Sequence, residues 1–419
     1  MLKLFLATYA ALWRIALPFL HRKPRLADGW EERTLTRTAG RDFDLWIQSA
    51  SGGESLLSQM VLTSIAEQLA GSDKKLRILA TATTREGINT LRKTPAADNI
   101  DLTVAFFPFD APAIITRAFN AFRPRLAVLI ETELWPAWLI TARCMKVPVL
   151  LVNGRMSDKS CRSYRRLRRF FTAFGPGRVL AMSEEDAAHF RSILPPERVQ
   201  TVPNLKFDRM DFSNSTPPFS FQSPENSPFI VLGSVRAEEE EQIARCLDIL
   251  CKARPDVTIA LFPKHPGRAP ALTEMLATRR LPARLRSSLK ETCAPGTIIV
   301  WDSFGDLAAA WSRADAAFVG GSLCDWGGHN FLEPLAFGVR PVIGLNWKNF
   351  AWIGREVISC GLVSEVEEEQ QLARTLLERL STPDDRDEVR HRIENLFAGK
   401  RGGTAVTCTE ILAALNAKP

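Results

Sequence analysis

Short apolar runs alternate with helix-length segments along most of the chain, and this alternation limits the fold more than any other feature. In the first half, runs suited to buried strands lie at residues 45–50, 77–82, 103–107, 126–130, 147–152 and 179–182. A second series lies at residues 229–233, 257–262, 297–301, 316–319 and 341–344. Because strands that alternate with helices form parallel βαβ units, the pattern predicts an α/β protein with two doubly wound, Rossmann-like domains.

Residues 208–227 separate the two series and are rich in Ser, Pro and Asn, without hydrophobic periodicity. We interpret this segment as an interdomain linker. A chain of 419 residues also exceeds what one hydrophobic core usually supports. The predicted domains are therefore residues 26–207 and 228–419, and a cleft between two such domains is where we expect the ligand.

Composition narrows the classes of function without naming one. The net charge is +7, with 54 basic and 47 acidic residues, which suggests an anionic partner. The eight cysteines are scattered without a zinc-binding pattern, which is typical of structural thiols in a reducing compartment. No phosphate-binding motif of ATPases and no GxGxxG motif occurs, so ATPase and dinucleotide-binding functions are disfavoured.

Residues 1–25 form an apolar and aromatic segment that ends in the basic sequence HRKPR. The apolar part, Leu4–Leu20, is interrupted by Arg14 and is marginal as a membrane-spanning helix. We expect a helix at the membrane surface, or a signal anchor, with its basic end on the cytoplasmic side. The alternative is a buried helix of the first domain.

The stretch from Asp315 to Arg340 combines an apolar run, two glycine pairs and a helix-like segment at residues 331–337. Glycines at a strand-to-helix turn let backbone N–H groups approach a ligand, and a helix start favours a phosphate or carboxylate. Asn330 and Glu333 are spaced as a capping box, which is the alternative interpretation. The length of the loop, residues 320–330, favours a ligand site.

Acidic side chains follow two predicted strands of the first half. Glu54 comes after two glycines at a predicted helix start and is a candidate general base, although it could also only complement the helix dipole. Glu131 and Glu133 follow the run at 126–130, where a site is favoured over simple helix capping. Lys206 lies near the linker, where a cation could reach a ligand in the cleft.

Basic side chains cluster in both halves. Residues 155–169 contain seven of them, beginning with Arg155, and form either a solvated helix face or a surface for phosphates or anionic lipid. Nucleic acid is disfavoured because no binding motif accompanies them. In the second half Lys264, His265 and Arg268 make a cationic cluster suited to a phosphate or carboxylate.

These motifs together resemble the 3-deoxy-D-manno-octulosonic acid (Kdo) transferases of lipopolysaccharide biosynthesis, over nearly the whole chain. The segments that carry the resemblance are SGGES (51–55), ETELWP (131–136), NGRMSDKS (153–160) with Tyr164, SEED (183–186), NLKFD (204–208), FPKHPGR (262–268), FGDL (304–307), FVGGSL (318–323) and GGHNFLEP (327–334). The resemblance implies a GT-B glycosyltransferase that transfers Kdo from CMP-Kdo to a lipid A precursor (lipid IVA), with inversion, on the cytoplasmic side of the cell inner membrane.

The resemblance also implies roles for individual residues. Glu54 matches the proton acceptor, and Glu131 and Lys206 match positions that stabilise the transition state. The segments expected to contact CMP are Lys264 and His265; Phe304, Gly305 and Asp306; and Asn330, Phe331, Leu332 and Glu333. Further candidates are Gly321, Ser322, Arg155 and Arg268. No metal or other cofactor is expected, because cations and helix dipoles can stabilise the leaving CMP.

Several positions depart from the family pattern. Gly53 replaces a common branched residue, Lys264 replaces a usual Arg and keeps only its charge, and Asp306 replaces a common Glu. Residues 233–236 and Gly267 also differ, which leaves the donor contacts there open. The alternatives are a GT-B transferase with a different sugar nucleotide and a non-catalytic, membrane-associated binding protein. The intact set of Glu54, Glu131 and Lys206 argues against the second.

Overall fold

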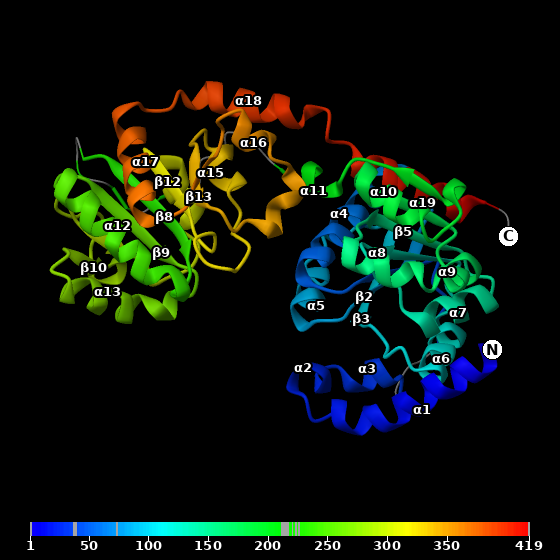
Figure 1. Ribbon diagram of the computed structural model, residues 1–419. Coiled ribbons are helices and arrows are strands. Elements are labelled where there is room, and N and C mark those ends of the chain that lie inside the picture. Colours follow the sequence, from blue (N-terminus) through cyan, green and yellow to red (C-terminus); the bar gives the residue numbers. More distant parts are fainter. Residues whose placement is uncertain are drawn as a thin grey trace. The chain divides into compact units, whose positions relative to one another are not determined.

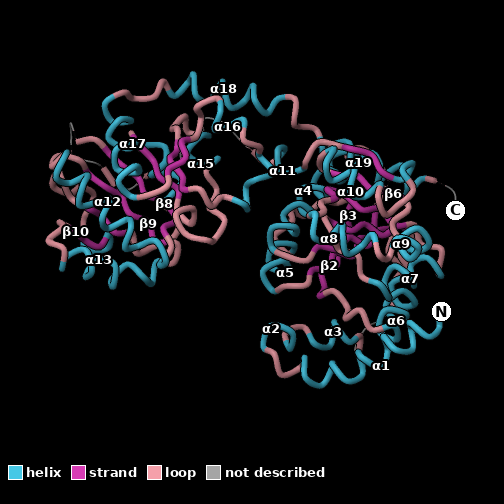
Figure 2. The backbone as a smooth tube through the Cα atoms, viewed as in Figure 1, coloured by secondary structure: helices cyan, strands magenta, loops and turns pink. Residues whose placement is uncertain are grey.

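The computed structural model describes residues 2–36, 40–72, 74–210, 218–219, 221–222, 224 and 227–417. Contacts divide the chain into two compact units, Met1–Arg209 with Lys400–Pro419, and Met210–Gly399 (Figure 1). Each unit is built around one parallel sheet covered by helices (Figure 2). The two α/β domains predicted from the alternating apolar runs are therefore present.

The first unit contains a seven-stranded sheet in the order β3-β2-β1-β4-β5-β6-β7. Its strands are β1 (Leu45–Ser49), β2 (Leu76–Ala82), β3 (Ile100–Phe106), β4 (Leu126–Ile130), β5 (Val149–Gly154), β6 (Arg178–Ala181) and β7 (Val199–Thr201). Every residue of β1, β4 and β5 is buried, as expected where helices cover both faces of a parallel sheet.

The helices of this unit are α1 (Leu2–Leu20), α2 (Pro24–Ala27), α3 (Trp30–Thr34), α4 (Gly52–Gln68), α5 (Arg85–Leu91), α6 (Pro112–Phe122), α7 (Pro136–Cys144), α8 (Asp158–Arg165), α9 (Arg168–Phe174), α10 (Glu184–Arg191), α11 (Leu205–Asp208) and α19 (Gly403–Asn416), with a 3₁₀ turn at Pro196–Arg198. Several begin directly after a strand, where a hydroxyl side chain accepts a backbone N–H: Ser51 caps α4, Thr84 caps α5 and Ser183 caps α10.

Two apolar layers hold the first unit together. On one face of the sheet, Trp46 and Leu129 pack with residues of α6, α7, α9 and α10. On the other face, Ile47 and Val128 pack with residues of α4, α5 and α19. The C-terminal helix α19 thus belongs to the core of the first unit, where the thiol of Cys408 donates to the carbonyl of Val61 at 3.5 Å.

The second unit contains another seven-stranded sheet, in the order β10-β11-β9-β8-β12-β13-β14. Its strands are β8 (Phe229–Val235), β9 (Thr258–Pro263), β10 (Ala283–Leu285), β11 (Ile298–Val300), β12 (Ala316–Val319), β13 (Pro341–Gly344) and β14 (Ser364–Val366). The helices are α12 (Glu240–Ala253), α13 (Ala269–Thr278), α14 (Leu307–Arg313), α15 (Leu332–Ala336), α16 (Glu356–Ser359), α17 (Glu369–Ser381) and α18 (Arg386–Ala398). Short 3₁₀ segments lie at Ala237–Glu239, Pro266–Arg268, Arg286–Ser288 and Lys348–Ile353. Apolar residues of α12, α13 and α17 cover one face of this sheet.

The predicted strands match the observed ones to within a few residues, and three further strands, β7, β10 and β14, were not predicted. Each of the three has three residues and lies at an edge of its sheet. An edge strand of this length carries too few buried side chains to leave an apolar run in the sequence.

The domain boundaries differ from the prediction at the C-terminal end. Residues 400–419 were assigned to the second domain, but they pack on the first unit. The apolar face of α19 explains this, since Cys408, Ile411 and Leu415 lie in the core that contains β1 and α4. The division at Arg209 and Met210 lies beside the start of the predicted linker, and most of residues 211–226 lie outside the described residues.

Candidate functional site

The winding of the first sheet reverses between β1 and β4, which are neighbours although β2 and β3 lie between them in the sequence. In open α/β sheets, ligands bind at the carboxyl ends of the two strands at such a switch point. Glu54 follows β1 and Glu131 follows β4. Both acids predicted from the sequence therefore lie at the place where the fold favours a site.

The Glu54 carboxylate is held by its own helix start. Its Oε2 atom accepts the backbone N–H of Ala50 at 2.6 Å, and its Oε1 atom accepts the hydroxyl of Ser51 at 3.1 Å. The Ser51 hydroxyl in turn accepts the Glu54 N–H at 3.4 Å, as the N-cap residue of α4. These hydrogen bonds fix the position of the Glu54 carboxylate at the start of α4.

The protonation of Glu54 is set mainly by burial. Burial is the largest cause, and together with the negative charges of Glu131 and Glu133 it raises the pKa of Glu54 to about 7. The hydrogen bonds from Ala50 and Ser51 act in the opposite direction. A carboxylate that titrates near neutral pH is suited to take up a proton during a reaction.

Glu131 and Lys206 form an ion pair within the first unit. Lys206 Nζ donates to Glu131 Oε1 at 2.7 Å, and their side chains are only 24% and 14% exposed. Glu131 adopts a left-handed backbone conformation, with φ of 58°, directly after β4. A backbone strained at this position is typical of a side chain held for a function.

Two asparagines place Lys206. Asn153 ends β5 with φ of 51°, and its Oδ1 atom accepts the N–H of Leu205 at 3.0 Å. Asn204 caps α11 by accepting the N–H of Lys206 at 3.0 Å. The sequence pattern indicated a cation near the end of this domain, but only the structure reveals its pairing with Glu131.

Glu133 faces different partners from Glu131. Its Oε2 atom accepts the indole N–H of Trp135 at 2.7 Å and the amide N–H of Gln48 at 3.3 Å. Burial raises its pKa, against the effect of these two hydrogen bonds. Burial also raises the pKa of Tyr164, and the charge of Glu133 contributes to that rise. Glu133 therefore ties the loop after β4 to β1.

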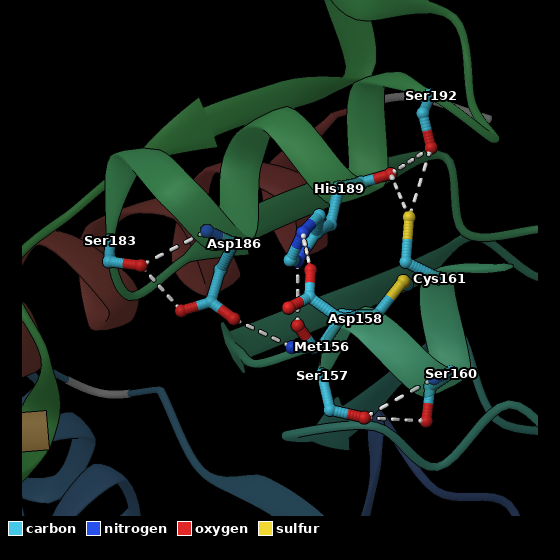
Figure 3. A network of polar contacts seen from close by, with 9 residues as sticks. All are labelled: Met156, Ser157, Asp158, Ser160, Cys161, Ser183, Asp186, His189 and Ser192. Carbon is cyan, nitrogen blue, oxygen red and sulfur yellow. Dashed lines mark hydrogen bonds and ion pairs between the residues drawn. The ribbon is translucent and has the colours of Figure 1, made fainter. Parts of the chain in front are cut away.

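A polar network fixes the loop that carries Arg155 (Figure 3). The Asp186 carboxylate accepts the N–H of Met156 at 2.7 Å, and His189 joins the Met156 carbonyl at 2.7 Å to Asp158 at 3.1 Å. The backbone carbonyl of Arg155 accepts the hydroxyl of Thr132, which connects this loop to the one after β4. The guanidinium of Arg155 is left on the surface, since the residue is exposed.

The basic segment beyond Arg155 forms α8, α9 and the turn between them. Its cationic residues are all exposed, and no ion pair to them is present in the described part of the chain: Arg155, Lys159, Arg162, Arg165, Arg166, Arg168 and Arg169. Seven exposed cations beside one another form a surface that attracts anions.

In the second unit the switch point lies between β8 and β12, and the glycine-rich loop follows β12. The buried Glu239 carboxylate accepts the N–H groups of Gly321 at 2.6 Å, Leu323 at 3.3 Å and Arg236 at 2.9 Å. Burial raises the pKa of Glu239, and these three hydrogen bonds oppose the rise. Glu239, which the sequence did not single out, therefore shapes this loop.

Two of the predicted ligand contacts in this loop already have partners in the protein. The N–H of Gly321 is taken by Glu239, so it is not available to a phosphate. Ser322 is buried, and its hydroxyl donates to Val319 at 2.7 Å and accepts from Gly344 at 2.8 Å. Both residues thus help to shape the loop, and their contact with a ligand stays a prediction.

A cationic cluster lies beside this loop. Burial is the largest cause, and together with the positive charges of Lys264, Arg236 and His265 it lowers the pKa of His329 to about 4. Arg236 lies over the Trp326 ring, 3.6 Å from its centroid. Lys264 and His265 follow β9 as predicted, whereas Arg236 and His329 were not among the predicted site residues. Arg236 directly follows β8, and His329 directly follows the second glycine pair. These positions could have indicated both residues.

Arg268 lies outside this cluster. Its guanidinium forms a bidentate pair with the buried carboxylate of Glu240, at 2.7 and 3.2 Å. This pairing opposes the prediction that Arg268 contacts a ligand, because a ligand would have to displace a carboxylate from it.

Phe304, Gly305 and Asp306 were also predicted to contact the CMP-sugar donor. Phe304 is 80% exposed, and Gly305 beside it has φ of 112°. Asp306 accepts the indole N–H of Trp301 at 2.9 Å. An aromatic ring exposed to this extent at a strand end is available to stack on a ligand.

Asn330 and Glu333 point to one another, with Asn330 Nδ2 donating to Glu333 Oε1 at 3.0 Å. Asn330 Oδ1 also accepts the N–H of Leu332 at 3.3 Å. The N-cap residue of α15 is Phe331, so Asn330 is not the N-cap residue that the capping-box interpretation requires. Phe331 and Leu332 are buried. Among the described residues, no group of three or more His, Cys, Asp and Glu side chains is arranged to hold a metal ion.

The chain is similar to several known proteins. The family model described as 3-deoxy-D-manno-octulosonic-acid transferase (kdotransferase) matches residues 28–209. The 3-deoxy-D-manno-octulosonic acid transferase of Haemophilus influenzae is 27% identical over 77% of this chain and 75% of that protein. The transferase of the same description from Rickettsia bellii is 28% identical over 84% of this chain and 83% of that protein.

Solved structures show the same fold. A glycosyltransferase from Rickettsia africae covers 90% of this chain and 100% of that chain, with a TM-score of 0.56 and 12% identity. The two parallel sheets and this likeness identify the fold as GT-B. The chain is similar to Kdo transferases over residues 28–209 in the family model and over most of its length in these two relatives.

Proposed function

We propose that the protein transfers Kdo from CMP-Kdo to a hydroxyl group of a lipid A precursor, with inversion at the anomeric carbon. The observation that carries this proposal is the pair of features at the first switch point. Glu54 has a pKa of about 7, and the Glu131–Lys206 ion pair follows the neighbouring strand and α11. The transferred sugar is the one named by the proteins to which the chain is similar. The donor CMP-Kdo and the lipid acceptor follow from the resemblance of the sequence motifs.

In this mechanism the ionised Glu54 accepts the proton of the acceptor hydroxyl. The hydroxyl oxygen then forms a bond to the anomeric carbon of Kdo, and the bond from that carbon to the CMP phosphate oxygen breaks. CMP leaves with the electron pair of that bond. Because Glu54 titrates near neutral pH, its conjugate acid forms without a large cost in free energy. The ammonium group of Lys206 stabilises negative charge that develops in the transition state.

The second unit is proposed to bind the donor. The phosphate and carboxylate of CMP-Kdo are anions, and Lys264, His265 and Arg236 supply positive charge at the carboxyl ends of β8 and β9. Phe304 offers an exposed ring to the base. Asn330 and Glu333 are proposed to hold the ribose hydroxyls. No metal is needed in this scheme, because the protein's own cations stabilise the leaving group.

The experiment that tests this function is an assay with CMP-Kdo and a tetraacyl lipid A precursor. Release of CMP is followed, and the lipid product is weighed by mass spectrometry, with and without EDTA. A product heavier by one or more Kdo units, formed equally with EDTA, is the expected result. A product formed only from another sugar nucleotide would reject the proposed donor, and loss of activity in EDTA that Mg²⁺ restores would reject the metal-independent scheme.

We also propose that the protein acts at a membrane surface through α1. Leu2–Leu20 is long and apolar enough to cross a bilayer, with a mean hydropathy of 1.3. One side of α1 packs on the first unit, where Trp13, Leu17 and Leu20 meet the cluster around Phe109. The opposite side leaves large apolar residues exposed: Leu4, Leu12, Ile15 and Phe19. A helix that is docked along one side favours an orientation in the plane of the membrane.

Replacing Leu12, Ile15 and Phe19 together by Gln is expected to weaken binding to vesicles by at least about tenfold, because three apolar side chains no longer enter the bilayer. Binding is measured by flotation with vesicles that contain anionic phospholipid. The control is Met145→Gln, since Met145 is an exposed apolar residue of the same unit away from α1. Equal binding of the triple variant and the wild type would contradict the in-plane orientation.

A further inference from the structure

Helix α1 is connected to the loop that follows β4 through one buried carboxylate, that of Asp110. We propose that the hydrogen bond from Tyr9 to Asp110 couples the docking of α1 to the position of residues 131–135, and that Asp110 is a positioning residue for this loop. The link between this coupling and catalysis rests on the proposed function, whereas the coupling itself does not.

The contacts of Asp110 join three elements of the first unit. Its Oδ2 atom accepts the hydroxyl of Tyr9 at 2.9 Å and the N–H of Ala137 at 3.0 Å. Its Oδ1 atom accepts the N–H of Trp138 at 2.8 Å. Asp110 is 2% exposed, and burial raises its pKa to about 6, against the effect of these hydrogen bonds. The carboxylate is therefore fully engaged by α1 and α7.

Helix α7 depends on Asp110 for its start. The residue at its N-cap position is Trp135, whose side chain makes no capping hydrogen bond, and Pro136 has no N–H group. The next two backbone N–H groups, of Ala137 and Trp138, have no partner within the helix. Asp110 supplies the acceptors that a capping side chain normally provides, from a different part of the chain.

The start of α7 in turn limits the loop that carries the acids. Only residues 131–135 connect the end of β4 to α7. Within this loop Trp135 binds Glu133 through its indole N–H, and Glu131 is held in a left-handed conformation. A loop of five residues with both ends fixed has little freedom, so a shift of α7 changes the position of Glu131 and Glu133.

Tyr9 connects α1 to Asp110 through its hydroxyl group. Its neighbour one turn along α1, Trp13, packs on Phe109 with ring centroids 5.8 Å apart. Phe109 directly precedes Asp110, so the apolar and polar parts of the contact lie side by side. In Figure 1, α1 runs beside α6, which begins just after Asp110. When α1 leaves this position, the Tyr9 hydroxyl leaves the carboxylate.

Hydrogen exchange of the Ala137 and Trp138 amides tests the coupling without any substrate. Tyr9→Phe keeps the ring and removes the hydroxyl, and we expect exchange at these amides to become about tenfold faster. Leu12→Ala is the control, because Leu12 lies on the exposed side of α1. Exchange in α4 and α19, which share a core of the first unit, reports whether this unit is folded in each variant. Wild-type exchange rates in Tyr9→Phe would overturn the proposal.

A second variant separates coupling through Asp110 from a general loosening of α1. Asp110→Asn keeps one acceptor oxygen and loses the charge, so it also accelerates exchange at the two amides. If Tyr9 acts through Asp110, adding Tyr9→Phe to Asp110→Asn has little further effect. Fully additive effects would reject the coupling. In the transfer assay, a lower kcat with an unchanged KM for the donor is expected of Tyr9→Phe; unaltered kcat would show that the loop position does not matter for catalysis.

Discussion

Glu54→Gln is expected to lower the rate of Kdo transfer by about 10²–10⁴-fold, because the amide cannot accept a proton from the acceptor hydroxyl. The substitution preserves the shape of the side chain and its ability to accept the N–H of Ala50. Donor binding should therefore remain close to that of the wild type. The measurement is the initial rate of CMP release with both substrates, together with the Kd for CMP.

The dependence of the wild-type rate on pH provides a second measure of the same residue. With a Glu54 pKa of about 7, kcat/KM should rise with pH below neutrality and reach a plateau above about pH 8. Glu86→Gln is the matched control, since Glu86 is an exposed acid whose side chain lies against Gly52, two residues from Glu54. A Glu54→Gln variant with more than a tenth of the wild-type rate would reject Glu54 as the base.

The contribution of Glu54 to the free energy of unfolding should fall as the pH rises, whereas its contribution to activity should rise. The pKa of Glu54 is raised in the folded state from 4.5 to about 7, so folding favours the protonated form. This contribution to stability is fully present below pH 4.5 and is lost as the pH rises through 7. At pH 8 the ionised carboxylate costs about 3 kcal/mol, and Glu54→Gln avoids much of this cost. Urea unfolding at pH 5 and pH 8 measures the difference, which should be evident only at the higher pH.

Much of the fold could be predicted because a buried parallel strand leaves a continuous apolar run. The runs at 126–130 and 316–319 coincide with β4 and β12. The helix α19 shows the limit of this approach, because an apolar helix face does not indicate which of two cores it joins. The edge strands β7, β10 and β14 were missed because backbone hydrogen bonds to one neighbour, and not burial, define them.

The candidate site could be predicted where a residue directly follows a strand. Glu54, Glu131 and Lys264 are of this kind, since the carboxyl ends of parallel strands meet at one edge of the sheet. Pairings between distant segments could not be predicted. Asp110 lies 27 residues before the amide of Ala137 that it binds, and nothing in its own segment indicates that partner. Likewise, Glu239 is one of four consecutive glutamates. The sequence does not indicate which of the four binds the glycine-rich loop.

Lys206→Met is expected to lower the transfer rate by at least about 10²-fold and to lower the free energy of unfolding by about 2–4 kcal/mol. The loss of stability arises because the Glu131 carboxylate, only 14% exposed, loses the ammonium group that lies 2.7 Å away. Rates are measured in the transfer assay and stability by urea unfolding. Lys93→Met is the control, because Lys93 is an exposed lysine of the same unit and should tolerate the change in both measurements.

The double variant Glu131→Gln/Lys206→Met separates structural from catalytic effects of this pair. Removing both charges leaves no unpaired carboxylate at this position, so most of the lost stability should return. Activity should not return, because the ammonium group that stabilises the transition state is still absent. If the double variant recovers the rate as well as the stability, the pair serves only to hold the loop after β4, and the cation that assists the leaving group must come from elsewhere. The cluster of Lys264, His265 and Arg236 would then be the candidate.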